Sequence, residues 1–367
     1  MMILKTNAHL SRRHLVPLVF ALFTVTLLAG AEFYLRRTAT ADKALVPRVF
    51  YSRNTALRSA NYGRVVRNQS GVDVVFIGSS IVQTGIRPRL FDRVVAEEHG
   101  LKTTSFNCGL GGGGLDTNAI YLKNLWLKRG HPKIVVHGVR LADVISSQSG
   151  EAKWQEEMFN PGGIERMWMS HSSFVLARSS LIERLMILQY SGLFPEFLKV
   201  LREGKKVATM RTDARRQDDG RGFMALRETL AEKLQKEKRV KGSSQYGPRG
   251  DEKSYTRGKA KIKEIKKICD NSGALYVLIN IPEHPNMYGK EGAGLYSRYV
   301  NWIRDFSLEK DFRFVDPSNG DPRWINSDVL FADYRHLTFE GAELLTRKLA
   351  IDVFEGWDEG YESLRRK

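Results

Sequence analysis

Two short segments, far apart in this chain, carry residue types that can perform nucleophilic catalysis together. Ser80 ends the run Asp73 to Ser80, in which apolar residues lead into one glycine and two serines. Asp333 and His336 lie three residues apart, just before a segment with helical periodicity. A serine, a histidine and a carboxylate can serve as nucleophile, general base and orienting group. We therefore expect Ser80, His336 and Asp333 to form a catalytic triad.

The elements that must position these residues follow an alternating pattern. Strands are expected at 72–77, 103–107, 133–139, 274–281 and 313–315, and helices at 88–99, 116–128, 260–271, 292–306 and 339–354. This alternation predicts an α/β fold, a flavodoxin-like three-layer sandwich of about five parallel strands. Ligands bind at the carboxyl ends of such strands, which is where Ser80 would lie.

The charge pattern divides the chain further. We expect a tail and anchor at 1–37, a stalk at 38–70, an α/β domain at 71–150 and 254–367, and a basic helical insertion at 151–253. Helices are expected in this insertion at 173–190, 193–201 and 224–238. Residues 199–266 hold 21 basic and 10 acidic side chains. This excess is typical of a solvated helical face, or of a surface that meets anionic lipid or polymer.

The N-terminal segment has the length of a membrane span. Leu15 to Gly30 contains no charge, and the apolar character continues to Leu35 with one interruption at Glu32. Basic residues precede the segment, which favours a cytoplasmic N-terminus. We predict an uncleaved single-pass anchor in a bacterial inner membrane, with the remaining chain extracytoplasmic. A signal peptide cleaved near the small residues 29–31 and a buried core helix are the alternatives.

Composition limits the classes of partner. The chain has 367 residues and a net charge of +17, but no zinc-finger spacing or RNA-binding aromatic motif. We therefore expect an anionic membrane surface or polymer as partner and no nucleic acid. Cys108 and Cys269 have no metal-ligand spacing, so neither a metal nor a cofactor is implied. They are expected to be buried thiols, or a disulfide in an oxidising compartment.

A glycine-rich segment follows the second expected strand. Asn107, Gly109 and Gly112 form the pattern N-x-G-x-x-G, in which the Gly112 N–H could join that of Ser80 in an oxyanion hole. Asn107 is a candidate for substrate binding. The same glycines also fit a dinucleotide fingerprint, but that motif lacks its acidic partner after the next strand. His284, just after the fourth strand, is a second substrate-binding candidate or a structural loop histidine.

In this order the motifs resemble the SGNH (GDSL-like) hydrolase superfamily, with Ser80, Gly112, Asp333 and His336 on its motif positions. Two positions depart from that pattern. Ser79 replaces the usual Asp before the nucleophile, and Arg140 stands where the oxyanion-hole Asn is expected. Arg140 could complete the oxyanion hole electrostatically, bind an anionic substrate group, or pair with a carboxylate such as Asp143.

The single anchor, and Arg140 in place of the oxyanion-hole Asn, look more like the membrane-anchored branch of this superfamily. That branch includes the D-alanyl transfer protein of lipoteichoic acid modification and alginate O-acetylation proteins. The resemblance implies a serine esterase or O-acyltransferase acting on a cell-envelope polysaccharide, beside a multi-spanning membrane acyltransferase. The alternative is a non-catalytic scaffold or polymer-binding component that keeps the fold.

Overall fold

A parallel five-stranded sheet forms the centre of the protein, with strand order β2-β1-β3-β4-β5. The computed structural model describes residues 19–30, 71–145, 220–236, 252–287, 289–319 and 328–357, and the single positions 62, 65, 66, 324, 362 and 364. The strands are β1 (Val74–Gly78), β2 (Ser105–Asn107), β3 (Ile134–Val139), β4 (Leu275–Asn280) and β5 (Arg313–Val315). The sequence predicted all five, with ends that differ by at most two residues.

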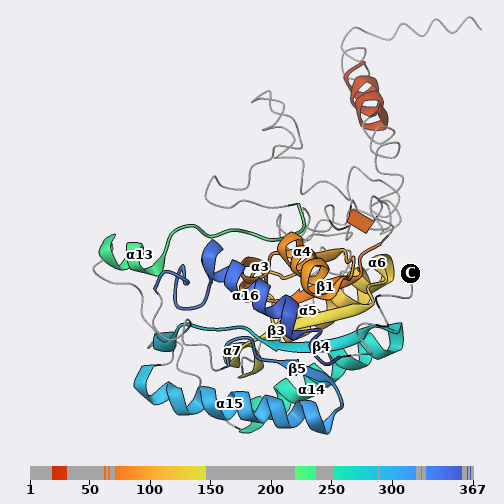
Figure 1. Cartoon of the computed structure of the whole chain (residues 1–367). Helices are drawn as coiled ribbons and strands as arrows, with labels where there is room; N and C mark the ends of the chain where they lie inside the picture. Colours follow the sequence, from red (N-terminus) through yellow and green to blue (C-terminus); the bar gives the residue numbers. More distant parts are fainter. Residues whose placement is uncertain are drawn as a thin grey trace, which may run out of the picture.

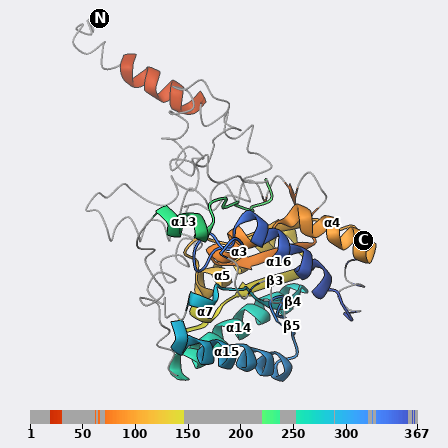
Figure 2. The ribbon, with the colours of Figure 1, turned by 60° about the vertical axis from the view of Figure 1, so that its left-hand side comes forward.

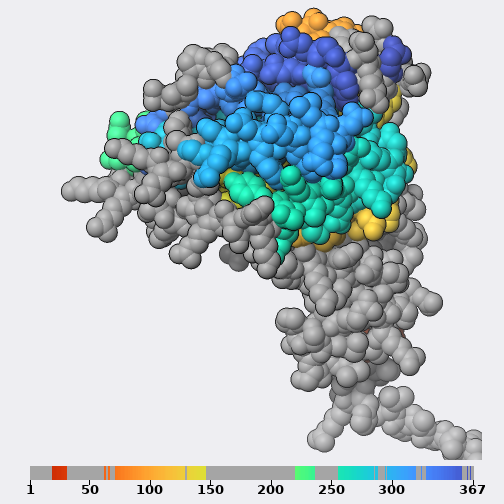
Figure 3. Space-filling model, turned by 90° about the horizontal axis from the view of Figure 1, so that it is seen from below, coloured from red at the N-terminus to blue at the C-terminus, as the bar shows by residue number. Residues whose placement is uncertain are grey.

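Helices cover both faces of the sheet (Figures 1 and 2). One face carries α3 (Ser80–Gly85), α4 (Pro88–His99) and α16 (Phe339–Asp352). The other carries α5 (Leu115–Tyr121), the π-helical turn η1 (Leu122–Trp126), α6 (Leu127–Gly130), α7 (Leu141–Ile145), α14 (Glu252–Ser272) and α15 (Gly289–Glu309). Seen from below, α14 and α15 form one continuous surface (Figure 3). The predicted α/β layering is therefore confirmed.

The three central strands, β1, β3 and β4, are mostly apolar because both of their faces are covered. Val74 and Phe76 of β1 pack in the core with α4 and α16, whereas Val75 and Ile77 pack in the core with α5, α14 and α15. The register places Gly78 of β1 beside Gly138 of β3. The carboxyl ends of the two central strands therefore meet at one edge of the sheet.

The helix ends follow local signals. Pro88 occupies the first turn of α4, and Gly100 ends that helix in a left-handed conformation with φ of 65°. Thr338 caps α16, because its hydroxyl accepts a hydrogen bond from the Gly341 N–H at 3.2 Å. The predicted helices at 88–99 and 339–354 match α4 and α16 closely. The basic helix predicted at 260–271 begins earlier, at Glu252.

One predicted helix is wrong over much of its length. The segment 224–238 was expected to be helical, but α13 spans only Leu230–Lys236. The residues before it run irregularly and bond to other elements instead, as the Met224 N–H does to the Gln83 carbonyl at 3.0 Å. The helices predicted at 173–190 and 193–201, and most of the predicted insertion, lie outside the described residues.

Within the predicted N-terminal anchor, the structure describes a helix at residues 19–30. Its large apolar side chains are exposed, from Leu28 at 46% to Phe20 at 71%. Among the described residues, no helix has the length and apolar character needed to cross a membrane. In the predicted stalk, Tyr62 is fully buried, and its hydroxyl donates to the Trp126 carbonyl at 2.8 Å. Cys108 and Cys269 are both buried thiols.

Candidate active site

The turn from β1 into α3 places Ser80 at the carboxyl edge of the sheet. Gly78 (φ of 152°) and Gly138 lie side by side beneath α3. A Cβ at Gly78 would lie 2.3 Å from Val82 Cγ2, and one at Gly138 would lie 2.4 Å from the same atom. The two glycines thus leave room for Val82 and allow α3 to pack directly on the strand ends. Ser80 begins this helix and is half-buried.

Ser80, His336 and Asp333 form one chain of hydrogen bonds. Ser80 Oγ lies 2.8 Å from His336 Nε2, and His336 Nδ1 lies 2.9 and 3.0 Å from the two Asp333 carboxylate oxygens. The carboxylate accepts the Nδ1 proton, which leaves the Nε2 lone pair facing the serine hydroxyl. The structure thus brings together the three residues that the sequence singled out, in the order required for proton removal from Ser80.

Asp333 is held as a carboxylate by its own loop. One of its oxygens accepts the backbone N–H groups of Arg335 and His336, each at 2.9 Å. Burial acts to raise the pKa of the Asp333 carboxyl, but the hydrogen bonds and charge of His336 outweigh it and hold the pKa well below its ordinary value. The group is therefore ionised at neutral pH and can stabilise an imidazolium.

The glycine-rich loop after β2 packs against the serine helix. A Cβ at Gly109 would lie 2.6 Å from the backbone nitrogen of Gln83, one turn along α3 from Ser80. Gly111 also approaches Gln83, and Gly112 is exposed with φ of 76°. The loop that carries Gly112 therefore lies beside the nucleophile helix, as an oxyanion contribution from Gly112 requires.

Asn107 has a different role from the predicted one. Its amide nitrogen donates to the Val82 carbonyl at 2.7 Å and to the Ile86 carbonyl at 2.8 Å, while its amide oxygen accepts the Gly109 N–H at 2.9 Å. The side chain is fully buried. Because both amide protons and the oxygen are engaged, Asn107 ties α3 to the glycine-rich loop rather than facing a substrate.

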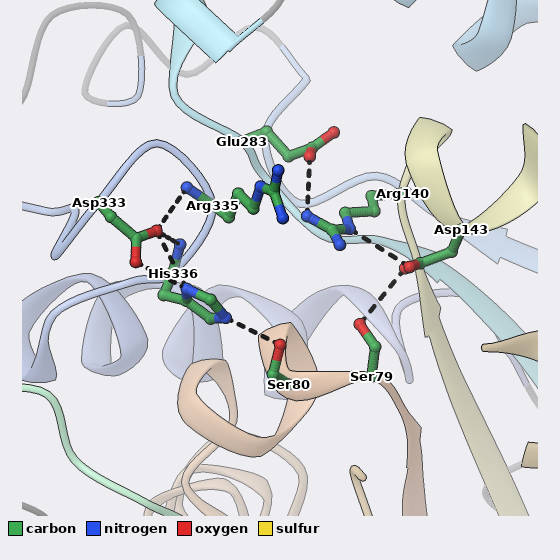
Figure 4. A network of polar contacts seen from close by, with 8 residues as sticks. All are labelled: Ser79, Ser80, Arg140, Asp143, Glu283, Asp333, Arg335 and His336. Atoms are coloured by element: carbon green, nitrogen blue, oxygen red, sulfur yellow. Dashed lines mark hydrogen bonds and ion pairs between the residues drawn. The ribbon is translucent and has the colours of Figure 1, made fainter. Parts of the chain in front are cut away.

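Arg140 belongs to a buried network of charged groups beside the serines (Figure 4). Its Nε donates to Asp143 at 3.3 Å, and its terminal nitrogen lies 3.5 Å from Glu283. The Ser79 hydroxyl lies 3.5 Å from the other Asp143 oxygen. Burial raises the pKa of the Asp143 carboxyl, although Arg140 and Ser79 oppose this shift. Of the three roles considered for Arg140, the structure shows the pairing with carboxylates.

His284 supports the loop that carries Asp333. Its Nδ1 accepts the Asn286 N–H at 3.2 Å, so its Nε2 donates to Asp328 at 2.8 Å. The ring packs edge-on against Phe331 and Tyr334 and is only 4% exposed. These contacts favour the structural alternative for His284 over the predicted substrate contact.

Sequence reasoning missed two parts of the site. Glu283 is one, because nothing in its local pattern pairs it with Arg140, which follows a different strand. The second is the segment Gly220–Lys236, which the sequence places in a separate insertion. It bonds both to α3, which carries Ser80, and to the loop that carries Asp333. The sequence did contain a signal for the start of α13 in this segment, because Thr229 and Glu232 have the spacing of a helix-capping box.

Comparisons with known proteins give only distant structural matches. No family model matches the chain, and no curated protein matches it. Similar solved structures include a Bacteroides fragilis protein provisionally described as an acylhydrolase, at 11% identity and a TM-score of 0.38, covering 83% of this chain and 98% of its own.

Two further solved structures have comparable scores. A GDSL-like lipase from Bacteroides thetaiotaomicron has 10% identity and a TM-score of 0.35, covering 82% of this chain and 98% of its own. A lipase from a goat rumen metagenome has 10% identity and a TM-score of 0.34, covering 76% of this chain and 95% of its own. Likeness at this level does not define an activity, so the function has to be inferred from the site's own residues.

Proposed function

We propose that this protein is an SGNH-type serine hydrolase, an esterase or O-acyltransferase that works through an acyl-enzyme. The observation that carries the proposal is the hydrogen-bonded chain from Ser80 through His336 to Asp333. It lies at the carboxyl edge of a parallel sheet, where α/β proteins place their ligands.

The chemistry follows from this geometry. His336 Nε2 takes the proton of Ser80 as the serine oxygen attacks an ester carbonyl, and Asp333 stabilises the imidazolium that forms. The imidazolium then gives that proton to the departing alcohol, which leaves the acyl group on Ser80. In the second half-reaction, His336 removes a proton from water or a sugar hydroxyl as its oxygen attacks the acyl carbonyl. The imidazolium then returns that proton to the Ser80 oxygen as the bond between this oxygen and the acyl group breaks.

The oxyanion of each tetrahedral intermediate needs donors close to Ser80. The Ser80 N–H lies in the first turn of α3, where no acceptor exists within the helix. We assign this group and the Gly112 N–H as donors, with Arg140 contributing positive charge from its place beside the serines. Asp143 and Glu283 fix the guanidinium in position and offset part of its charge.

The substrate class and the location that we propose are taken from the apolar N-terminal segment and the charge of the chain. The exposed apolar helix at residues 19–30 supports a single-pass anchor in the bacterial inner membrane with an extracytoplasmic catalytic domain. The basic excess of the chain supports an anionic membrane surface or polymer as partner. Together they favour a cell-envelope polysaccharide as acyl donor or acceptor, with a multi-spanning acyltransferase as a neighbour in the membrane.

Labelling with a fluorophosphonate tests the nucleophile directly. We expect the wild-type protein to gain one phosphonyl group, mapped to Ser80 and not Ser79 by peptide mass spectrometry. Ser80→Ala should abolish the label and lower ester hydrolysis by several powers of ten, leaving the small residual rate that substrate binding and the oxyanion donors supply. Ser272→Ala is the matched control, because Ser272 lies at the end of α14, across the sheet from α3, and its hydroxyl donates to the Cys269 carbonyl of the same helix.

The opposite result would favour the non-catalytic scaffold. In that case the wild-type protein stays unlabelled, and Ser80→Ala leaves the cellular phenotype unchanged. The Ser80–His336 contact would then be a structural hydrogen bond.

A further inference from the structure

The segment Gly220–Lys236 binds the elements that position the nucleophile. The Asn107 N–H donates to the Arg221 carbonyl at 2.8 Å, and the Met224 N–H donates to the Gln83 carbonyl at 3.0 Å. Gln83 also donates from its side chain to the Met224 sulfur. Gln83 lies one turn after Ser80, so the segment holds the serine helix from its outer side (Figure 1).

A buried ion pair fixes the start of this segment. Arg221 donates to the Ser105 carbonyl at 2.9 Å and to Asp92 of α4 at 3.2 Å, and its side chain is 11% exposed. Asp92 also accepts the Ser105 N–H at 3.2 Å. The start of β2 and the interior of α4 are therefore joined to the segment through paired and hydrogen-bonded groups.

The other end of the segment contacts the acid–base loop, which we define as Asp328–Leu337. The Leu230 N–H donates to the Phe331 carbonyl, and the Lys233 ammonium donates to the Ala332 carbonyl, both at 2.6 Å. Lys233 is half-buried and lies in α13. Two successive carbonyl groups immediately before Asp333 are thus held by one helix.

That helix begins with a reciprocal capping box. The Glu232 N–H donates to the Thr229 hydroxyl at 3.1 Å, and the Thr229 N–H donates to the Glu232 carboxylate at 2.9 Å. The capping box leaves the Leu230 N–H, a first-turn donor, for Phe331. The contact between α13 and the acid–base loop is therefore made by a helix end whose geometry is fixed.

Inside the loop, the same residues set the position of the histidine. Phe331 pairs with Leu337 as an antiparallel bridge, and the Ala332 N–H donates to the His336 carbonyl at 2.7 Å. Ala332 therefore links Lys233 on one side to His336 on the other. A charge-assisted hydrogen bond to its carbonyl fixes the loop more firmly than a neutral one would.

We propose that Lys233 is a positioning residue for the acid–base loop, holding His336 at hydrogen-bond distance from Ser80 through the Ala332 peptide. The proposal rests on the proposed serine-hydrolase function for its effect on rate. Its structural part, the ordering of the loop by Lys233, stands independently of that function.

The test compares full-length wild type with Lys233→Met, which keeps the aliphatic stem and removes the donor. We expect fluorophosphonate labelling of Ser80 and kcat for p-nitrophenyl acetate to fall about ten- to a hundredfold, with KM little changed. Lys233→Arg, which can still donate to the carbonyl, should restore the rate to within about threefold. Lys267→Met on α14, across the sheet, is the charge-matched control and should behave as wild type.

Hydrogen exchange gives a readout that does not need activity. The Ala332 and His336 amide protons should exchange at least about tenfold faster in Lys233→Met, with the unfolding midpoint close to wild type. Unchanged exchange in the acid–base loop would overturn the proposal, as would full labelling of Lys233→Met alongside a labelled wild type. An unlabelled wild type whose loop still loosens in Lys233→Met would instead contradict the proposed function and leave the positioning role intact.

Discussion

At the residue scale, the site depends on a carboxylate that must remain ionised beside a histidine. Asp333 accepts two backbone N–H groups and the His336 ring N–H, and these bonds hold its pKa well below the ordinary value. The same bonds fix the tautomer that presents a lone pair to Ser80. The function of Asp333 and the stability of its loop therefore have one physical origin.

Replacing Asp333 by Asn tests whether catalysis needs the charge of this side chain. The amide keeps the shape of the side chain but cannot stabilise an imidazolium, so we expect kcat/KM for ester hydrolysis to fall about 10²–10⁴-fold. Asp270→Asn, on the exposed surface of α14, is the matched control and should retain activity. Wild-type activity in Asp333→Asn would show that His336 does not need an ionised partner.

The depressed pKa of Asp333 also predicts a pH dependence of stability. Because the native pKa lies below the unfolded one, the carboxylate stabilises the fold above the unfolded pKa of about 4, and this contribution is lost as pH falls. Urea unfolding between pH 7 and pH 3 should show a smaller loss of stability for Asp333→Asn than for wild type. Parallel pH profiles for the two proteins would contradict this assignment.

At the element scale, the serine helix packs on the sheet because two adjacent strands carry a glycine at or next to their carboxyl ends, Gly78 in β1 and Gly138 in β3. A Cβ at Gly138 would lie 2.4 Å from Val82 Cγ2 and 3.1 Å from Ile281 side-chain atoms. The nucleophile is therefore positioned by a direct contact between α3 and the ends of β1 and β3. Any added volume at this contact has to move α3, and Ser80 with it.

Gly138→Ala should lower stability by about 1–3 kcal/mol and reduce the rate of Ser80 labelling. Val82→Ala removes the clashing methyl groups, so the double variant should be less destabilised than the sum of the single variants. A double-mutant cycle from chemical denaturation measures this coupling, which we expect to be about 0.5–3 kcal/mol. Additive costs would mean that Gly138 is needed for another reason.

At the scale of the whole molecule, a buried histidine makes the stability of the fold depend on pH. His137 lies in the central strand β3 with no exposed surface, and its Nδ1 lies 2.8 Å from the Tyr276 hydroxyl. Its Nε2 has no hydrogen-bond partner among the described residues. Burial lowers the pKa of His137 to about 3 from the ordinary 6.5, so the native protein keeps it neutral.

Because the native pKa is the lower one, the stability linked to a neutral His137 is complete above pH 6.5 and is lost as pH falls toward 3. Between these values, wild-type stability should fall by up to about 1.4 kcal/mol more per pH unit than that of His137→Leu. Denaturant unfolding at several pH values measures the two slopes. The exposed His131, replaced by Asn, is the control. Equal slopes for wild type and His137→Leu would contradict this origin of acid sensitivity.

Most of the fold could be predicted because its signals are local. Continuous apolar runs such as Val74–Ile77 indicate strands covered on both faces, and helices such as α4 carry their own start and stop residues. Residues 224–229 were wrongly predicted as helix because their backbone bonds to distant elements, and no local pattern reports such partners. The same limit explains why Asn107 and His284 were taken for substrate contacts.

By itself, the sequence determined the residue types of the site and the pairing of Asp333 with His336, because a separation of three residues lets a carboxylate reach the ring within one loop. It also determined the alternation of elements that puts Ser80 at a strand end. Only the tertiary structure decided that Ser80 meets His336 and that Arg140 lies between two carboxylates. It alone also placed a segment of the predicted insertion so that it joins the serine helix to the acid–base loop. These contacts join residues far apart in the chain, so they form only when the packed sheet and helices bring those residues together.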